Sequence, residues 1–167
     1  LKYYLHIINE NSPTEDEKKP TPDFEKIPPK YGDDLPFWGE KIKEKYKLSN
    51  DCEITIECNP NSVTKEKLLV YKNVGINRIS FGVQTLNNKV LKVLGRLHNK
   101  RDVVNAINMA KDIGFNNISC DLLLGLPKLR EFDYKKQIKT LYKLGVNHIS
   151  AYMLIVEENT VLDIKVK

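Results

Sequence analysis

The chain repeats one short phrase, which reads GINRIS at residues 75–80, GFNNIS at 114–119 and GVNHIS at 145–150. The copies start 39 and 31 residues apart, at positions 75, 114 and 145. Each copy opens with a glycine, which commonly ends a helix, and continues into a segment typical of a strand. The stretches between the copies carry apolar residues at helical spacing: Val103, Ile107, Ala110 and Ile113, then Tyr134, Ile138, Leu141 and Tyr142. Alternating helices and strands predict βα units and a parallel sheet, as a barrel or part of one.

The same alternation extends back to about residue 36. A helix is expected over residues 36–48, a strand over Glu53–Cys58 that stops at Asn59-Pro60, and a helix from the cap Thr64 to Val74. Residues 36–167 are therefore expected to form one α/β domain. Residues 1–35 are expected to be irregular or disordered, because the stretch from residue 9 is charged, rich in proline and poor in apolar residues.

Composition narrows the functional class. The 167 residues carry 27 basic and 22 acidic side chains, a net charge of +5, and the basic ones are almost all lysines spread over predicted helix surfaces. A nucleic-acid groove would cluster this charge, so we expect no nucleic-acid partner. We also expect no transmembrane segment, since no apolar run approaches about 20 residues. Three cysteines are an odd and sparse set, which indicates a reducing compartment: the cytoplasm, or a mitochondrion or plastid if the source is eukaryotic.

Side-chain alternation places polar residues on one face of the predicted strands. Ile79, Phe81 and Val83 share one face of their strand, so Gln84 falls on the other face, and Glu57 and Asp121 follow in the neighbouring strands. Barrel interiors are mostly filled by bulky branched residues, so buried carboxylates there need compensation. Three explanations are open: the face meets water, it forms an internal network such as Asp121 paired with Arg96, or it binds a polar ligand at the strand ends. The last is favoured, because such sheets bind ligands there.

Four ordered motifs carry a family resemblance from about residue 53 to residue 160. They are Glu57-Cys58-Asn59-Pro60, then the segments 77–84 (NRISFGVQ), 94–98 (LGRLH) and 121–127 (DLLLGLP). Together they resemble the radical S-adenosylmethionine (SAM) proteins of the oxygen-independent coproporphyrinogen III oxidase group. The GRLH and ECNP phrases favour its HemW branch, whose members are described as heme chaperones.

The resemblance implies a fold and a ligand. It implies a partial (β/α)6 radical SAM TIM-like barrel of about four parallel strands with flanking helices. It also implies that SAM lies across the carboxyl ends of the strands, with a glycine such as Gly82 leaving space for the nucleoside. Its contacts map onto Glu57, Gln84, Arg96 and Asp121, and onto Ile155 through the backbone.

The chain also departs from the family pattern. The family's Cys-x3-Cys-x2-Cys loop, which ligates a [4Fe-4S] cluster, is absent, as is its Gly-Gly-Gly-Thr-Pro segment. Cys52, Cys58 and Cys120 are too scattered to replace the loop and are interpreted as buried thiols. Tyr4–Ile7 echoes the family's first strand, and the region that should follow is missing or replaced. An internal deletion, a mispredicted gene, a decayed copy or a specialised homologue would each explain this.

Three functional hypotheses follow from the resemblance. The leading one is a HemW-like protein that binds SAM and transfers heme to acceptor proteins, here without cluster chemistry and without catalytic or metal-binding residues. The alternatives are a coproporphyrinogen III oxidase, and a non-catalytic remnant or binding module. Heme is a further candidate ligand, but the spacing of His6, His98 and His148 is not diagnostic, so each is expected to be a surface or packed histidine.

Overall fold

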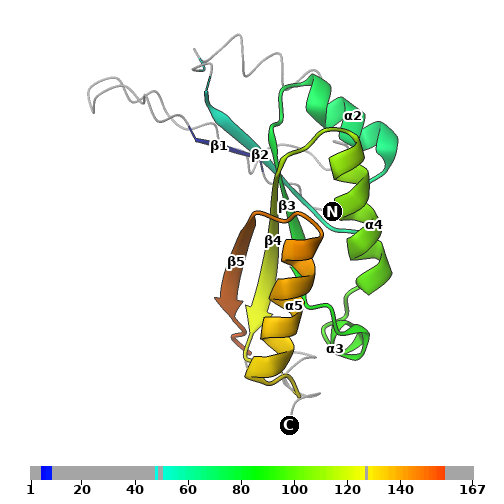
Figure 1. Cartoon of the computed structure of the whole chain (residues 1–167), viewed down its shortest axis with the longest axis vertical. Coiled ribbons are helices and arrows are strands. Elements are labelled where there is room, and N and C mark those ends of the chain that lie inside the picture. Colours follow the sequence, from blue (N-terminus) through cyan, green and yellow to red (C-terminus); the bar gives the residue numbers. More distant parts are fainter. Residues whose placement is uncertain (1–4, 9–47, 49–50, 127, 157–167) are drawn as a thin grey trace, which may run out of the picture.

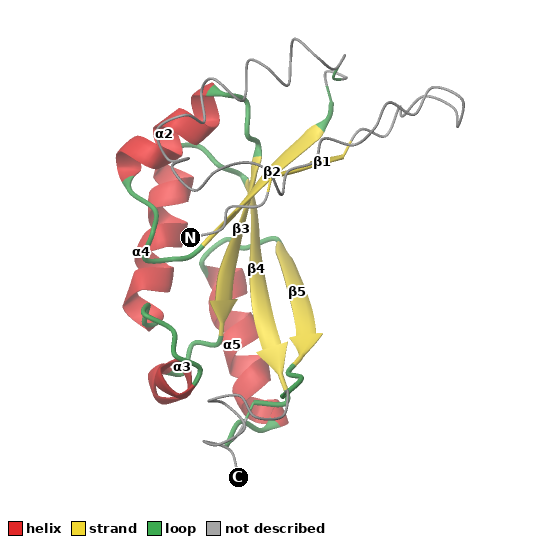
Figure 2. Cartoon of the chain, turned by 180° about the vertical axis from the view of Figure 1, so that it is seen from behind, coloured by secondary structure: helices red, strands yellow, loops and turns green. Residues whose placement is uncertain are grey.

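A computed structural model describes residues 5–8, 48, 51–126 and 128–156 of the chain. The predicted helix over 36–48, apart from residue 48, and almost all of the predicted irregular segment 1–35 lie outside these ranges. The described elements form one sheet with helices on one of its faces, as Figures 1 and 2 show from opposite sides.

The sheet has the strand order β1-β2-β3-β4-β5. Four strands run parallel to one another and match the predicted ones: β2 (Glu53–Cys58), β3 (Arg78–Gln84), β4 (Asn117–Leu124) and β5 (His148–Met153). The strand β1 (Leu5–Ile8) pairs antiparallel with β2. Its direction therefore differs from that of the other strands, and its interpretation as a remnant of the family's first strand stays a prediction.

Four helices connect the parallel strands: α2 (Lys65–Asn73), α3 (Asn88–Val93), α4 (Lys100–Asp112) and α5 (Glu131–Lys143). Thr64 caps α2 as expected, because its side chain accepts a hydrogen bond from the Lys67 amide. Each connection leaves the end of one strand and returns to the start of the next, as parallel pairing requires. This successive order is that of part of a barrel, which confirms the predicted fold class.

The repeated phrase marks the return from helix to strand. Its glycines, at 75, 114 and 145, follow the helix ends with φ of 97°, 92° and 89°, a conformation that favours glycine. The asparagine two residues later then joins neighbouring strands. Asn77 accepts from the Ile54 amide and donates to the Cys52 carbonyl, and Asn147 accepts in the same way from the Ile118 amide.

The hydrophobic core lies between the sheet and the helices. Its strand contribution includes Ile56, Ile79 and Ile118, all fully buried. On α4 the predicted apolar face is confirmed, since Val103 and Ala110 are among its buried residues. On α5 the prediction was wrong in part: the buried residues are Gln137 and Leu141, whereas Ile138 and Tyr142 are exposed.

Candidate functional site

The face of the sheet opposite the helices, here called the inner face, carries the polar residues that strand alternation predicted. Glu57 on β2 lies opposite Ser80 on β3, and Asp121 on β4 lies opposite Ser150 on β5. The Ser80 hydroxyl donates a hydrogen bond to Asp121 Oδ1 over 3.2 Å. Two carboxylates from neighbouring parts of the sheet therefore share this region with two hydroxyl groups.

The environment of Asp121 disfavours its charged form. Burial raises the pKa of Asp121, and the nearby charge of Glu57 raises it further. Hydrogen bonds from Ser80 and Ser150 and the charge of Arg78 oppose this shift without cancelling it. A bound cation, or hydroxyl donors on a ligand, would stabilise the charged form of this carboxylate.

A second group of polar side chains lies near the ends of β2 and β3. Arg96, which follows α3, donates from Nη1 to Asn59 Oδ1 over 3.5 Å. A Cβ placed on Gly82 would lie 3.3 Å from Gln84 Nε2 and 3.7 Å from Asn59 Oδ1. The amides of Gln84 and Asn59 thus lie over Gly82, with the guanidinium of Arg96 beside them. Burial lowers the pKa of Arg96, which marks a partly desolvated cation.

Four of the five predicted site residues therefore lie in two groups near the carboxyl ends of the strands: Glu57 with Asp121, and Gln84 and Arg96 beside Asn59. The suggested internal pair of Asp121 and Arg96 is replaced by other contacts, since Arg96 bonds Asn59 and Asp121 accepts from Ser80. Ile155, the fifth residue, comes just after β5 with a largely exposed side chain.

Asn59, Ser80 and Ser150 belong to this region, but sequence reasoning did not single them out as site residues. All three lie on the inner face by the same alternation that selected Glu57 and Asp121. A carboxylate on a strand is a strong sequence signal because it is charged, whereas a small neutral polar side chain is a weak one. Their position on the inner face, which alternation predicts, is the signal that could have identified them.

The cysteines lie on the helix-covered side of the sheet or next to it. Cys52, Cys58 and Cys120 are all buried, which confirms their interpretation as packed thiols. Burial raises the pKa of Cys58 and of Cys120 to about 12. Within the described part of the chain, no group of three His, Cys, Asp or Glu side chains could hold a metal ion. The described residues therefore do not fit a [4Fe-4S] cluster, whose ligands are thiolates.

The two histidines with described side chains differ in their surroundings. His98 is buried, and its Nε2 donates to the Val83 carbonyl over 3.1 Å. His148, at the start of β5, is exposed and accepts at Nδ1 from the Ser119 hydroxyl and from Arg78 Nη2. One is thus a packed and the other a surface histidine, as expected. The side chain of His6 lies outside the described residues.

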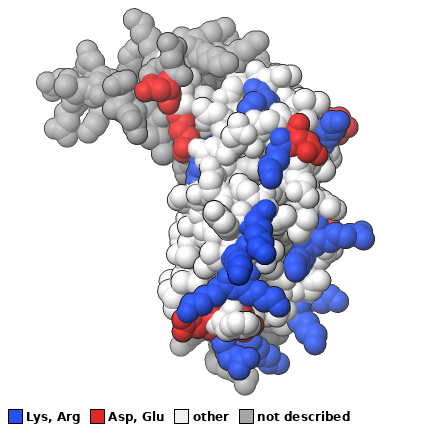
Figure 3. All heavy atoms as spheres, viewed as in Figure 1, with Lys and Arg blue, Asp and Glu red and all other residues white. Residues whose placement is uncertain are grey.

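Two other features of the surface lie apart from these polar groups. Lysine and arginine side chains spread over the face shown in Figure 3, with acidic side chains among them. A hollow of about 280 Å³ lies on the helix side of the molecule. It is lined by residues of α5, of the segments after β3 and β4, and of the start of α4, so it is separate from the inner face. Among the described residues, no helix is long and apolar enough to cross a membrane.

The fold and the inner face define an α/β protein of parallel βα units with polar groups gathered at the carboxyl ends of its strands. The family model of the radical SAM superfamily matches residues 29–141, and the chain belongs to this superfamily.

Named relatives agree with the predicted branch. The heme chaperone HemW of Bacillus subtilis is 42% identical over 123 residues, which cover 73% of this chain and 32% of the relative. HemW of Escherichia coli is 34% identical over 119 residues, covering 71% and 32%. The mitochondrial radical S-adenosyl methionine domain-containing protein 1 of Bos taurus is 33% identical over 123 residues, covering 74% and 28%.

Solved structures agree as well. Coproporphyrinogen III oxidase (HemN) from Escherichia coli, a radical SAM enzyme, matches with a TM-score of 0.70 and 25% identity over 81% of this chain and 32% of that one. The predicted resemblance to the coproporphyrinogen oxidase group and its HemW branch is thus confirmed. The chain spans about a third of the length of these relatives.

Proposed function

We propose that this chain binds SAM on its inner face and serves in a HemW-like protein that handles heme. The observation that carries the proposal is the convergence of Glu57, Asp121, Gln84 and Arg96 near the carboxyl ends of adjacent parallel strands. Ligands bind at this end of parallel α/β sheets. The heme part of the proposal rests on the named function of the HemW relatives.

The chemistry of these residues suits the parts of SAM. Glu57 and Asp121 are carboxylates that can accept from ribose hydroxyls or from the methionine ammonium. Arg96 offers a planar set of donors for the methionine carboxylate. Gly82 leaves open the space that a Cβ would take beside Gln84 and Asn59, where a flat nucleoside can approach the backbone.

When bound, SAM supplies radical chemistry in this superfamily only together with a reduced cluster. The described residues do not offer a thiolate set for such a cluster, so no radical step is assigned to this chain. Its own residues would bind SAM, orient it and shield it from water. Ile155 is proposed to contribute through its backbone, as the family resemblance implies.

Titration calorimetry of the whole chain with SAM tests the proposal. Gly82→Ala is the informative variant, because its new methyl group would press on Gln84 Nε2 while the backbone stays in a conformation that alanine can adopt. We expect SAM affinity to fall several-fold with the melting temperature unchanged. The proposed site would be contradicted if Gly82→Ala left the SAM affinity unaltered, or if the wild-type chain did not bind SAM.

Heme handling is tested separately by optical titration of the same chain with hemin. A saturable shift of the Soret band at a one-to-one ratio is the expected result. The fold similarity to HemN supports a second candidate, a part of a coproporphyrinogen III oxidase. Tight binding of coproporphyrinogen III with no binding of hemin would favour that candidate over the chaperone.

A further inference from the structure

Gln84 has an unusual backbone conformation. Its φ is +64°, in the left-handed region that residues other than glycine rarely adopt. The pairing of β3 with β4 also changes register here: Phe81 pairs with Cys120, but Gln84 pairs with Leu122. An extra residue therefore enters β3 just before Gln84. Such a conformation persists only where the surroundings impose it.

A tight turn holds this conformation from within the chain. The Thr85 amide donates to the Val83 carbonyl over 2.7 Å, which closes a three-residue turn around Gln84. Both flanking residues are fully buried, whereas Gln84 is half-buried and its amide lies over Gly82 on the inner face. The turn thus sets the direction of the Gln84 side chain.

One side of the turn is fixed by His98. Its Nε2 donates to the same Val83 carbonyl over 3.1 Å, so that this oxygen accepts two hydrogen bonds. The imidazole is buried, and burial lowers the pKa of His98, which favours the neutral ring. The bond requires a hydrogen on Nε2, which in the neutral ring means the Nε2–H tautomer.

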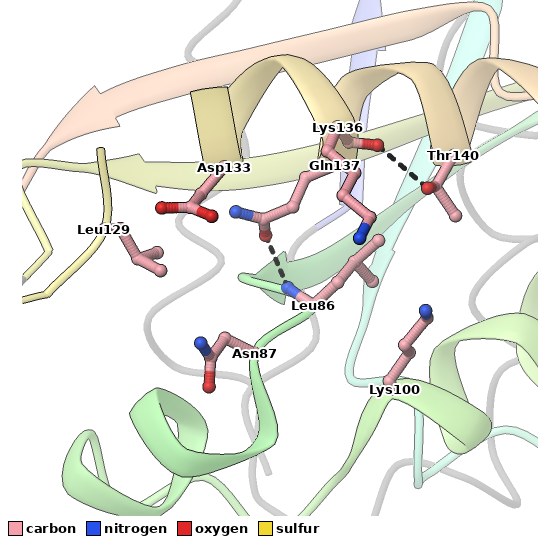
Figure 4. Close-up of a pocket in the computed structure, with 8 residues that line it drawn as sticks. All are labelled: Leu86, Asn87, Lys100, Leu129, Asp133, Lys136, Gln137 and Thr140. Atoms are coloured by element: carbon pink, nitrogen blue, oxygen red, sulfur yellow. Dashed lines mark hydrogen bonds between the residues drawn. The ribbon is translucent and has the colours of Figure 1, made fainter. Parts of the chain in front are cut away.

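The other side of the turn is fixed by Gln137 of α5, which belongs to the next βα unit. Its Oε1 accepts from the Thr85 hydroxyl over 2.9 Å and from the Leu86 amide over 2.6 Å. Figure 4 shows the second of these bonds, between α5 and the segment that follows β3. Gln137 is 7% exposed, although it is polar and lies on the core face of its helix. Its buried amide oxygen is thus fully used in holding this segment.

We infer that His98 and Gln137 are positioning residues that clamp the turn of residues 83–85 and thereby aim Gln84 at the ligand. The inference deepens the proposed function and rests on it, since it takes Gln84 to contact SAM. Both residues bond the segment around Gln84: His98 bonds the Val83 carbonyl, and Gln137 bonds Thr85 and Leu86. This role also accounts for a histidine in the LGRLH motif without making it a heme ligand.

Paired variants separate positioning from mere packing. His98→Leu and Gln137→Leu remove the donor and the acceptor, whereas His98→Gln keeps a donor at the same reach and Gln137→Glu keeps the acceptor oxygen. Thr140→Ala on α5 is the matched control, because that hydroxyl bonds only within its own helix, to the Lys136 carbonyl. Each variant is measured by calorimetry with SAM, by thermal unfolding, and by hydrogen exchange of the Thr85 and Leu86 amides.

We expect each leucine variant to weaken SAM binding roughly tenfold, the effect of about one lost hydrogen bond, and to speed exchange at Thr85 and Leu86. His98→Gln and Gln137→Glu should keep most of the SAM affinity and most of the protection of the two amides. Thr140→Ala should change neither the affinity nor the exchange. Unchanged affinity in both leucine variants of a chain that binds SAM would overturn the inference.

The proposed function can fail independently. If the wild-type chain does not bind SAM, the SAM site is wrong, and hydrogen exchange alone decides whether the clamp exists. Unaltered exchange at Thr85 and Leu86 in the leucine variants would then overturn the clamp as well. Faster exchange there would support the clamp as the device that holds Gln84.

Discussion

The two faces of the sheet are built for different tasks. The face under the helices is a continuous apolar layer, in which Ile79, Phe81 and Ile118 have no exposed surface. The inner face carries half-buried carboxylates beside small hydroxyl residues, and the Ser80 hydroxyl donates a hydrogen bond to Asp121. The same strands supply both faces by simple alternation.

The difference separates stability from ligand binding. Apolar burial on the helix side supplies the main stabilising free energy of the fold. The carboxylates of the inner face add little stabilising free energy. Asp121 even opposes folding, because burial and the charge of Glu57 disfavour its ionised form. The half-buried carboxylates of the inner face can therefore change with less effect on folding than the fully buried apolar residues of the helix side.

The largest expected effect concerns the thiols of the helix-covered face. Because burial raises the pKa of Cys58 and Cys120 to about 12, their thiolate fraction at pH 8 is on the order of a thousandfold below that of a free cysteine. Iodoacetamide should therefore leave both residues unmodified in the folded chain and label both in urea, as measured by mass spectrometry. Rapid labelling of either residue in the folded chain would show that this face is not closed.

The next effect concerns stability. Ile118→Ala removes a fully buried side chain from β4 and should lower the free energy of unfolding by about 2–5 kcal/mol in urea denaturation. Leu123→Ala on the inner face of the same strand is the matched control, and its half-buried side chain should cost clearly less. Equal costs would remove the distinction between the two faces.

A smaller effect is expected at Asp121, where one substitution should raise stability and weaken SAM binding. Its folded-state pKa is raised, so stability falls as the pH rises above the unfolded-state pKa, and the loss is complete above the folded-state pKa. Asp121→Asn should therefore slightly raise the melting temperature at pH 7 while weakening SAM binding about tenfold or more.

The pH dependence of binding follows from the same shift. In the wild-type chain SAM affinity should fall on acidification at a higher pH than an ordinary aspartate would give, because the neutral acid no longer attracts the cation. Calorimetry at a series of pH values measures this. A profile identical in wild type and Asp121→Asn would exclude Asp121 from the site.

Much of this comparison could be predicted from the sequence, because a repeated glycine and strict alternation are local signals. They defined the four parallel strands, their two faces and the positions of Glu57 and Asp121. Alternation also put Gln84 on the inner face, although its amide reaches that face through a register change and a positive φ.

Features set by tertiary contacts could not be predicted in this way. Apolar spacing on α5 suggested that Ile138 and Tyr142 face the core, but the helix turns Gln137 inward because the segment after β3 needs an acceptor there. The antiparallel direction of β1 and the bond between Arg96 and Asn59 likewise depend on residues distant in sequence.

The most direct test of the central claim is to locate bound SAM by hydrogen exchange of the whole chain with and without saturating SAM. The account predicts slower exchange at the carboxyl ends of β2, β3 and β4, around Glu57, Gln84 and Asp121, and no change at the helix-side hollow around Lys136. Protection confined to that hollow, or no protection at the strand ends despite binding, would contradict it.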